Sequence, residues 1–254
     1  MTSDASSVSD PLVIDHLSHR FATPGGEVPV LDDVSASFAA GTWTAIMGPS
    51  GSGKSTLMLC AAGLLRASDG NVTLAGTSVT DASEKQLTRL RRTRVGFIFQ
   101  SFNLVPSLTA AQNTELPLRL AGRRPKRSVA VEALQRVGLD GRSRHLPGEL
   151  SGGQQQRVAI ARALVTTPEV IFADDPTGAL DSHTSTAVLD LFQDMIADGS
   201  TVVMVTHDAR VAARADRVLF LFDGRIVDEI AGGDVEQIAT RLARLESAQS
   251  QDAA

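Results

Sequence analysis

Short apolar runs mark the predicted strands of this chain, and segments of helical pattern separate them. The runs with the clearest strand character are 43–47, 95–99, 170–173 and 201–206. A fully apolar run such as 170–173 is typical of a parallel strand that is covered on both faces. Helical patterns fill much of the sequence between these runs, at 56–65, 84–94, 107–146 and 151–164. The pattern therefore predicts an α/β fold with a parallel sheet.

The N-terminal part has a different pattern, in which turn residues interrupt short β-type runs. The runs between 12 and 38 are broken at Pro24-Gly25-Gly26, and a turn at 68–71 precedes the run 72–74. This pattern predicts a small antiparallel sheet beside the parallel one. A further hairpin is expected near the other end of the chain, around Asp223-Gly224.

The two ends of the chain are rich in Ser, Asp, Gln and Ala. Residues 1–10 and 246–254 are therefore predicted to be disordered tails around a folded domain of residues 11–245. With 43% hydrophobic and 21% charged residues, the composition is that of a soluble globular protein. The net charge of −5 argues against a nucleic-acid partner.

Cysteine usage and hydropathy bear on where the protein works. The single cysteine cannot form an internal disulfide, which favours a reducing compartment. No signal peptide is recognised at the polar N-terminus, and no apolar run approaches the roughly 18 residues that span a bilayer. Any work at a membrane is therefore expected to go through a partner.

A glycine-rich loop between the strand 43–47 and the following helix carries the strongest chemical signal. It reads Gly48-Pro49-Ser50-Gly51-Ser52-Gly53-Lys54-Ser55-Thr56. Glycines let backbone N–H groups surround a phosphate, and the helix N-terminus adds partial positive charge. In such a loop Lys54 reaches the β- and γ-phosphates and Ser55 binds Mg²⁺. The alternative, a flexible turn before a core helix, does not explain why all these residues fall at the required spacing.

A second potential anion site begins at Ser151, a good helix N-cap that is followed by Gly152, Gly153 and Gln154. The sequence therefore offers two incomplete phosphate sites. If they lie together in one subunit, they compete for the same ligand. If they lie apart, a two-fold dimer completes two nucleotide sites at once.

Polar side chains stand at the ends of three predicted strands. Asp174 and Asp175 follow the run 170–173, Gln100 follows 95–99, and His207 follows 201–206. Acidic groups at this edge of a sheet hold Mg²⁺ and position an attacking water. The plainer interpretations are a turn before Pro176, a surface glutamine and a strand-end histidine.

Basic residues gather in two segments. The helical stretch 84–94 carries four arginines, for which a solvated helix face is the preferred interpretation. The run 123–127 is interpreted as a solvated loop first and as a contact with lipid headgroups second.

Taken in order, these motifs resemble the ATP-binding cassette subunit of ABC transporters over roughly residues 12–230. The phosphate loop, Gln100, the signature 150–154, the acidic strand end, the loop 178–181 and His207 occur in the family's order. The sequences of segments 97–104, 116–118 and 173–181 are most similar to those in the branch of lipoprotein-release, macrolide-efflux and cell-division ATPases.

The resemblance implies a P-loop core with a parallel sheet, an antiparallel β subdomain and a helical subdomain at about 101–165 that carries the signature. It implies a homodimer closed by ATP, in which Ser151, Gly152, Gly153 and Gln154 of one subunit complete the partner's site. Asp181 joins the nucleotide-binding residues.

Further roles follow from the same resemblance. Ser55, Gln100 and Asp174 hold Mg²⁺, while Asp175, His207 and Gln100 are catalytic. The chain departs from the family at two positions. It has no tyrosine, so Phe21 is expected to stack on adenine. Asp175 stands where the family usually has a catalytic glutamate.

The expected function is a cytoplasmic ATPase subunit that lies on the inner face of the membrane and drives a separate permease. Two alternatives stay open. One is an ATP-gated clamp that regulates a membrane partner with little hydrolysis, and the other is a soluble ABC protein without a transport role.

Overall fold

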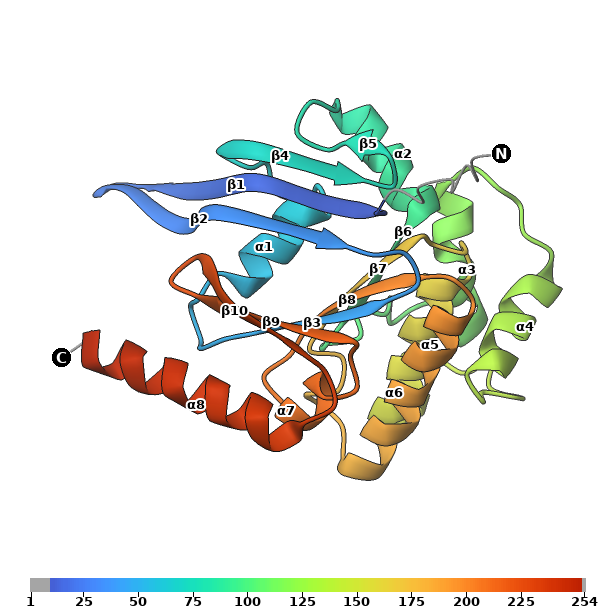
Figure 1. Ribbon diagram of the computed structural model, residues 1–254. Coiled ribbons are helices and arrows are strands. Elements are labelled where there is room, and N and C mark those ends of the chain that lie inside the picture. Colours follow the sequence, from blue (N-terminus) through green and yellow to red (C-terminus); the bar gives the residue numbers. More distant parts are fainter. Residues whose placement is uncertain (1–9, 253–254) are drawn as a thin grey trace, which may run out of the picture.

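The computed structural model describes residues 10–252, which form two sheets with helices around them (Figure 1). The six-stranded sheet has the order β10-β9-β3-β8-β7-β6, and the four-stranded sheet has the order β2-β1-β4-β5. The strands are β1 (Leu12–Thr23), β2 (Gly26–Phe38), β3 (Trp43–Met47), β4 (Asp69–Leu74), β5 (Thr77–Ser78), β6 (Val95–Phe99), β7 (Val170–Asp174), β8 (Thr201–Val205), β9 (Arg217–Phe222) and β10 (Arg225–Ala231).

The helices include one short 3₁₀ turn, Pro147–Glu149, which leads into α5. Their bounds are α1 (Lys54–Ala61), α2 (Glu84–Arg94), α3 (Ala110–Leu120), α4 (Arg127–Arg136), α5 (Gly152–Leu164), α6 (Ser182–Ala197), α7 (Ala209–Ala212) and α8 (Val235–Asp252). The helix predicted at 56–65 begins earlier and ends earlier, because Gly63 adopts a left-handed φ of 64° that stops it.

The six-stranded sheet is parallel except at one edge, where β10 runs antiparallel to β9. Side chains alternate between its two faces, so neighbouring residues enter different cores. Met47 and Met204 pack on one face with α5 and α6. Ile46 and Val203 pack on the other face with α1, α2 and the four-stranded sheet. The α/β fold and the antiparallel sheet predicted from the apolar pattern are confirmed.

The four-stranded sheet is built on the hairpin of β1 and β2, in which Thr23 pairs with Gly26. The turn predicted at 68–71 is wrong from Asp69 onward, because β4 begins there. At Gly70 a side chain would put Cβ 2.2 Å from the carbonyl oxygen of His16. Only glycine allows this close approach, so a residue typical of turns serves here to bring two strands together.

Helices α3, α4 and α5 pack on one another within the range for which a helical subdomain was predicted. The breaks expected at Gly122 and Pro125 fall between α3 and α4. Of the four arginines on α2, Arg91 does not belong to a solvated face, because its side chain is half-buried and donates a hydrogen bond to the carbonyl of Gly63.

The C-terminal helix corrects one prediction. Residues 246–252 were expected to be disordered, but α8 continues through them to Asp252. Ile238, Leu242 and Leu245 recur at helical spacing and pack against the core, which anchors the polar end of the helix. The expected disorder at 1–9 and 253–254 lies outside the described residues. Within residues 10–252, no helix combines the length and the apolar character needed to cross a membrane.

Candidate functional site

The loop between β3 and α1 has the backbone of a phosphate-binding loop. Gly48, Gly51 and Gly53 have φ values of 152°, 82° and 100°, which disfavour any residue with a Cβ. At Gly48 and Gly53 the neighbouring chain also leaves no room, since a Cβ would lie 2.0 Å from Leu221 O and 2.7 Å from Val30 O. The glycines therefore set both the turn and its close packing on the sheet.

Lys54 is folded back over this loop. Its Nζ donates hydrogen bonds to the carbonyl oxygens of Gly48 at 2.9 Å and Pro49 at 2.6 Å, and it lies 3.4 Å from Ser52 Oγ. Burial lowers the pKa of Lys54, and the charge of Asp174 opposes that shift. The predicted loop residues thus form one structure, in which Ser50, Gly51 and Ser55 are exposed and Thr56 is half-buried.

The carboxylates of Asp174 and Asp175 lie at the end of β7. The register places Asp174 between Phe99 of β6 and Val205 of β8, so the strand-end side chains meet at one edge of the sheet. Burial raises the pKa of Asp174, the charge of Asp175 raises it further, and Lys54 opposes both.

These residues fit a Mg²⁺ ion that is also bound by phosphate. The described residues hold no group of three His, Cys, Asp or Glu side chains that could bind a metal by themselves. Mg²⁺ commonly uses one or two protein oxygens together with substrate phosphate and water. Asp174 carries a desolvated carboxyl group beside a second one, an arrangement that a divalent cation stabilises.

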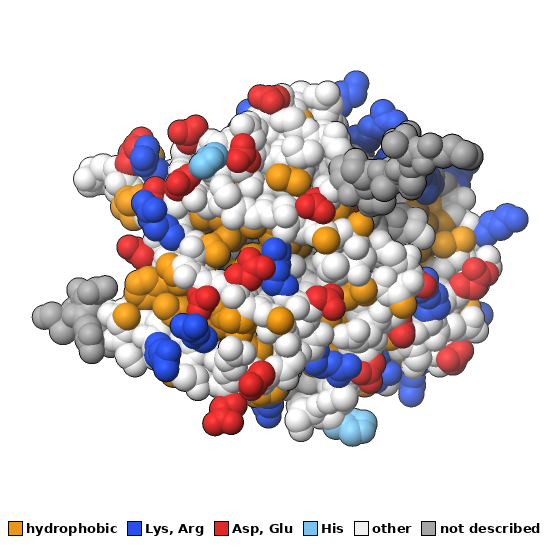
Figure 2. All heavy atoms as spheres, in the orientation of Figure 1, with side chains coloured by type: hydrophobic (Ala, Val, Ile, Leu, Met, Phe, Trp, Pro, Cys, Tyr) orange, Lys and Arg blue, Asp and Glu red, His pale blue; other side chains and the backbone are white. Residues whose placement is uncertain are grey.

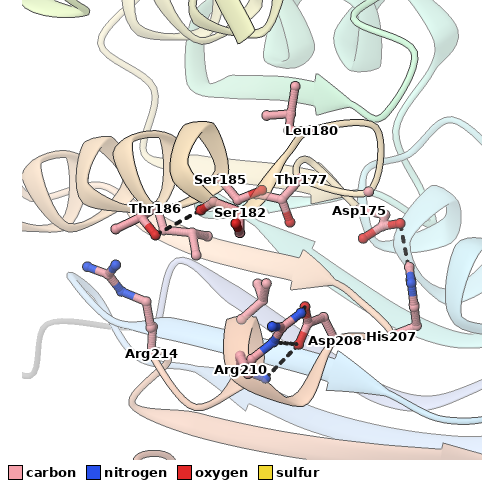
Figure 3. Close-up of a pocket in the computed structure, with 13 residues that line it drawn as sticks. Asp175, Thr177, Leu180, Ser182, Ser185, Thr186, His207, Asp208, Arg210 and Arg214 are labelled. Carbon is pink, nitrogen blue, oxygen red and sulfur yellow. Dashed lines mark hydrogen bonds and ion pairs between the residues drawn. The ribbon is translucent and has the colours of Figure 1, made fainter. Parts of the chain in front are cut away.

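Asp175 contacts the predicted histidine. His207 Nδ1 lies 3.2 Å from Asp175 Oδ2, and Figure 3 shows the two side chains pointing toward each other. The imidazole is 72% exposed, so its other edge is open to a ligand. Thr206 Oγ1 donates to Asp175 Oδ1 at 3.4 Å. The backbone N–H of Asp175 donates to Val205 O at 2.8 Å, which fixes the residue at the sheet edge.

Gln100 reaches the same place. A Cβ on Gly178 would lie 2.2 Å from Asp175 Oδ2 and 2.7 Å from Gln100 Nε2, so both side chains occupy the space above this glycine. All three predicted catalytic side chains therefore converge. Asp175 and His207 also border a cavity of about 340 Å³ between the segments that follow β7 and β8 (Figure 3).

The signature segment begins α5 as predicted. Ser151 Oγ accepts a hydrogen bond from Gln154 N, and Gln154 Oε1 accepts one from Ser151 N. This capping box leaves the N–H groups of Gly152 and Gly153 without intrahelical acceptors. Gly153 is nevertheless buried in its own subunit, because a Cβ there would lie 2.2 Å from Thr184 Cγ2. Gly152 is more open and its Cβ would make only ordinary contacts.

The remaining predicted residues occupy two other places. Asp181 caps α6, since its carboxylate accepts hydrogen bonds from Thr184 N and Thr184 Oγ1, and these bonds lower its pKa. Phe21 is 41% exposed on β1 and touches His19 edge to face at 4.6 Å between ring centres. Part of the Phe21 side chain is thus accessible to a ligand.

Gln156 is a site residue that the sequence reasoning missed. Its side chain is buried, and Nε2 donates to the carbonyl oxygen of Pro176 at 2.6 Å, one residue after Asp175. It therefore links α5 to the loop that follows Asp175, the predicted catalytic carboxylate. The signal was present in the sequence, because Gln156 follows Gly153 and precedes Ile160 at helical spacing, which puts a polar residue on the buried stripe of the helix.

The fold and the phosphate loop define a P-loop nucleoside triphosphatase. Residues 31–178 match the family model described as ABC transporter. The chain belongs to the ABC transporter family, as an ATP-binding cassette and an ATPase. This confirms the family resemblance predicted from the motifs.

The relatives agree with this assignment. The chain is 45% identical over 218 residues to the uncharacterized ABC transporter ATP-binding protein YvrO of Bacillus subtilis (strain 168), over 85% of this chain and 95% of that protein. It is 47% identical over 220 residues to the macrolide export ATP-binding/permease protein MacB of Burkholderia pseudomallei (strain K96243). That match covers 86% of this chain but 34% of MacB, so the chain spans about a third of that relative.

Among solved structures, a similar one is the dimeric post-hydrolysis state of the ATP-binding cassette MJ0796 bound to ADP and Pi. It matches with a TM-score of 0.80 and 39% sequence identity, over 87% of this chain and 98% of that one. The expected similarity to the macrolide-efflux branch is confirmed by these relatives.

Proposed function

We propose that two copies of this chain close on two Mg²⁺-bound ATP molecules at the inner face of a membrane and drive a permease with each cycle of hydrolysis. The main observation in support of the dimer is where the two phosphate half-sites lie in the fold. Helix α1, which follows the phosphate loop, packs in the core on one face of the six-stranded sheet. Helix α5, which begins at the signature, packs on the other face (Figure 1).

A single subunit therefore does not bring its own signature over its own phosphate loop. A two-fold axis does so twice, because each copy offers both half-sites. The free N–H groups at the start of α5 then meet the γ-phosphate of the nucleotide bound by the partner. The dimeric relative with ADP and Pi supports this arrangement for the present chain.

Each residue at the sheet edge has a role in this proposal. Lys54 moves from its loop carbonyls to the β- and γ-phosphates. Ser55 and Asp174 hold Mg²⁺, which supplies charge neutralisation on the phosphates. Asp175 accepts a proton from the attacking water, and His207 orients the γ-phosphate from its exposed edge.

Gln100 connects this chemistry to the permease. It follows Phe99, which lines an apolar groove of about 420 Å³ between α2, β6, α3 and α5. Leu64 and Leu120 are exposed at this groove, at 46% and 56%, although their apolar surface favours burial. We assign the groove to a segment of the permease with an apolar face, whose seating displaces Gln100 beside Asp175.

The loop after Gln100 carries three more apolar residues, Phe102, Leu104 and Val105, but it is a weaker candidate for the permease contact because Leu104 packs on the core. The loop is held from inside, since Asn113 bonds to Val105 N and Val105 O.

The dimer is tested with Gly152→Asp in the background of Asp175→Asn, where ATP is bound and not consumed. A carboxylate against the γ-phosphate is a like-charge contact that costs several kcal/mol in a desolvated interface. We expect the parent to sediment as a dimer with ATP and the Gly152→Asp variant as a monomer. Gly148→Asp adds the same charge at an open position and is expected to dimerise. A Gly152→Asp variant that dimerises like its parent would refute the composite site.

A further inference from the structure

A row of cations on α2 takes no part in the site described above. Lys85, Arg89 and Arg92 are exposed and recur at positions i, i+4 and i+7, so they share one face of the helix. Arg123, from the loop after α3, borders the same cavity of about 630 Å³. We call these four residues and the cavity the basic groove.

The basic groove lacks counter-charges. Within residues 10–252, none of its four cations lies within salt-bridge distance of a carboxylate. Glu84 borders the cavity, but its carboxylate lies 3.7 Å from Arg66 and 3.9 Å from Arg91.

Several other arginines of this chain are paired with carboxylates. Arg136, Arg214 and Arg225, for example, contact Asp198, Asp190 and Asp32. In a chain with a net charge of −5, unpaired cations gathered on one face indicate an anionic partner.

The basic groove is continuous with the apolar groove assigned to the permease. Thr88 and Arg92 line both cavities. Figure 2 shows Lys and Arg side chains gathered at the upper right, around the position of α2 in Figure 1. A permease seated in the apolar groove is embedded in a bilayer, so the basic groove then lies beside the membrane surface. This step rests on the proposed function.

We propose that the basic groove binds anionic phospholipid headgroups of the membrane leaflet that surrounds the permease. The cations extend from two separate elements, on long side chains that no partner fixes. Such a set suits a mobile surface that carries many phosphates better than it suits one carboxylate, which is bound by a fixed bidentate geometry. Anionic leaflets attract each nearby Lys or Arg by about fivefold in binding.

The test uses the whole chain and extruded vesicles of phosphatidylglycerol mixed with phosphatidylcholine in equal parts. Flotation measures the bound fraction, with pure phosphatidylcholine vesicles as the neutral reference. The test variant is Lys85→Gln, Arg89→Gln and Arg123→Gln together, because these three cations line the basic groove and not the apolar groove. Glutamine also keeps helix α2 at the first two positions. The control variant is Arg225→Gln, Arg241→Gln and Arg244→Gln, which removes equal charge from β10 and α8, on the side of the molecule away from α2 in Figure 1.

We expect the wild type and the control to float with the anionic vesicles and to be released by high salt. The test variant should bind them about 100-fold more weakly, from three charges at about fivefold each. Equal binding of both kinds of vesicle by the wild type would overturn the proposal. So would equal losses in the test and control variants, because binding would then follow net charge alone.

Two further measurements separate this inference from the proposed function. ATP-driven dimerisation should be the same in the test variant and the wild type. If the wild type itself does not dimerise with ATP, the composite site is refuted and the lipid proposal is unaffected. Assembly of the test variant with its permease in neutral detergent should also be unchanged. If that assembly fails, the basic groove binds an acidic segment of the permease and not lipid.

Discussion

Gly178 offers a sharp test of the catalytic geometry, because its missing side chain leaves the space that Asp175 and Gln100 occupy. In Gly178→Ala the new Cβ would lie 2.2 Å from Asp175 Oδ2 and 2.7 Å from Gln100 Nε2. A carbon and an oxygen without a covalent bond approach to about 3.3 Å. The carboxylate must therefore retreat by about 1 Å. A misplacement of that size at a reacting group costs roughly 100-fold in rate when nothing compensates.

The fold should tolerate this substitution. Both atoms in conflict are the ends of side chains, Gly178 is exposed, and its φ lies outside the left-handed range. A surface change of this kind alters the free energy of unfolding by about 0.5 kcal/mol or less. The matched control is Gly148→Ala, which adds the same methyl group at a glycine with nothing within 4 Å.

The assay is steady-state phosphate release over a range of ATP concentrations, with thermal unfolding measured on the same samples. We expect kcat to fall by about 100-fold in Gly178→Ala while KM, Tm and the Gly148→Ala control stay near the wild type. A kcat within twofold of the wild type would refute the reasoning, because it would mean that Asp175 is not needed where the structure places it.

Three further outcomes follow from the same site. Lys54→Ala should abolish tight ATP binding, measured by titration with a fluorescent ATP analogue, because this side chain supplies the mobile cation for the β- and γ-phosphates; an affinity within a few-fold of the wild type would contradict the role. Gln156→Leu removes the donor to Pro176 O and also a buried oxygen without a partner, so Tm should change little while kcat falls by about tenfold. Asp175→Asn should abolish phosphate release and keep ATP-driven dimerisation, and turnover at the wild-type rate would reassign the base to His207.

Much of the fold could be predicted because its signals are local. The fully buried strands are also continuous apolar runs, and the phosphate loop owes its shape to glycines within a few residues of one another. The convergence of Gln100, Asp175 and His207 was predictable for a related reason. Parallel strands deliver their C-terminal ends to the same edge of a sheet, so residues far apart in sequence meet there.

The features that could not be predicted depend on contacts between distant segments. Nothing in the sequence around Gly153 of the signature indicates a contact with α6, yet this glycine packs on Thr184. An aspartate at Gly153 would therefore disturb the monomer, and Gly152 is the better position for testing the dimer interface. The polar end of α8 likewise gives no local sign of order, but Gln249 Nε2 donates to Ser50 O of the phosphate loop at 3.0 Å.

The backbone conformation of Asp175 restricts which side chains this position accepts. Asp175 has a φ of 41°, in the left-handed region, where Asp is tolerated better than most residues because its short side chain bonds locally. Asp175→Glu should therefore lower stability by about 1 kcal/mol. The pKa values of free Asp and Glu differ by only about 0.4 units, so base strength hardly changes.

Reach should decide the rate of this variant. Glutamate extends one methylene further toward the attacking water, so we expect its kcat to equal or exceed that of the wild type even though its Tm falls. Phosphate release and thermal unfolding measured side by side separate the two effects. A variant that loses rate in proportion to stability would show that the left-handed backbone, and not the length of the side chain, limits hydrolysis at this site.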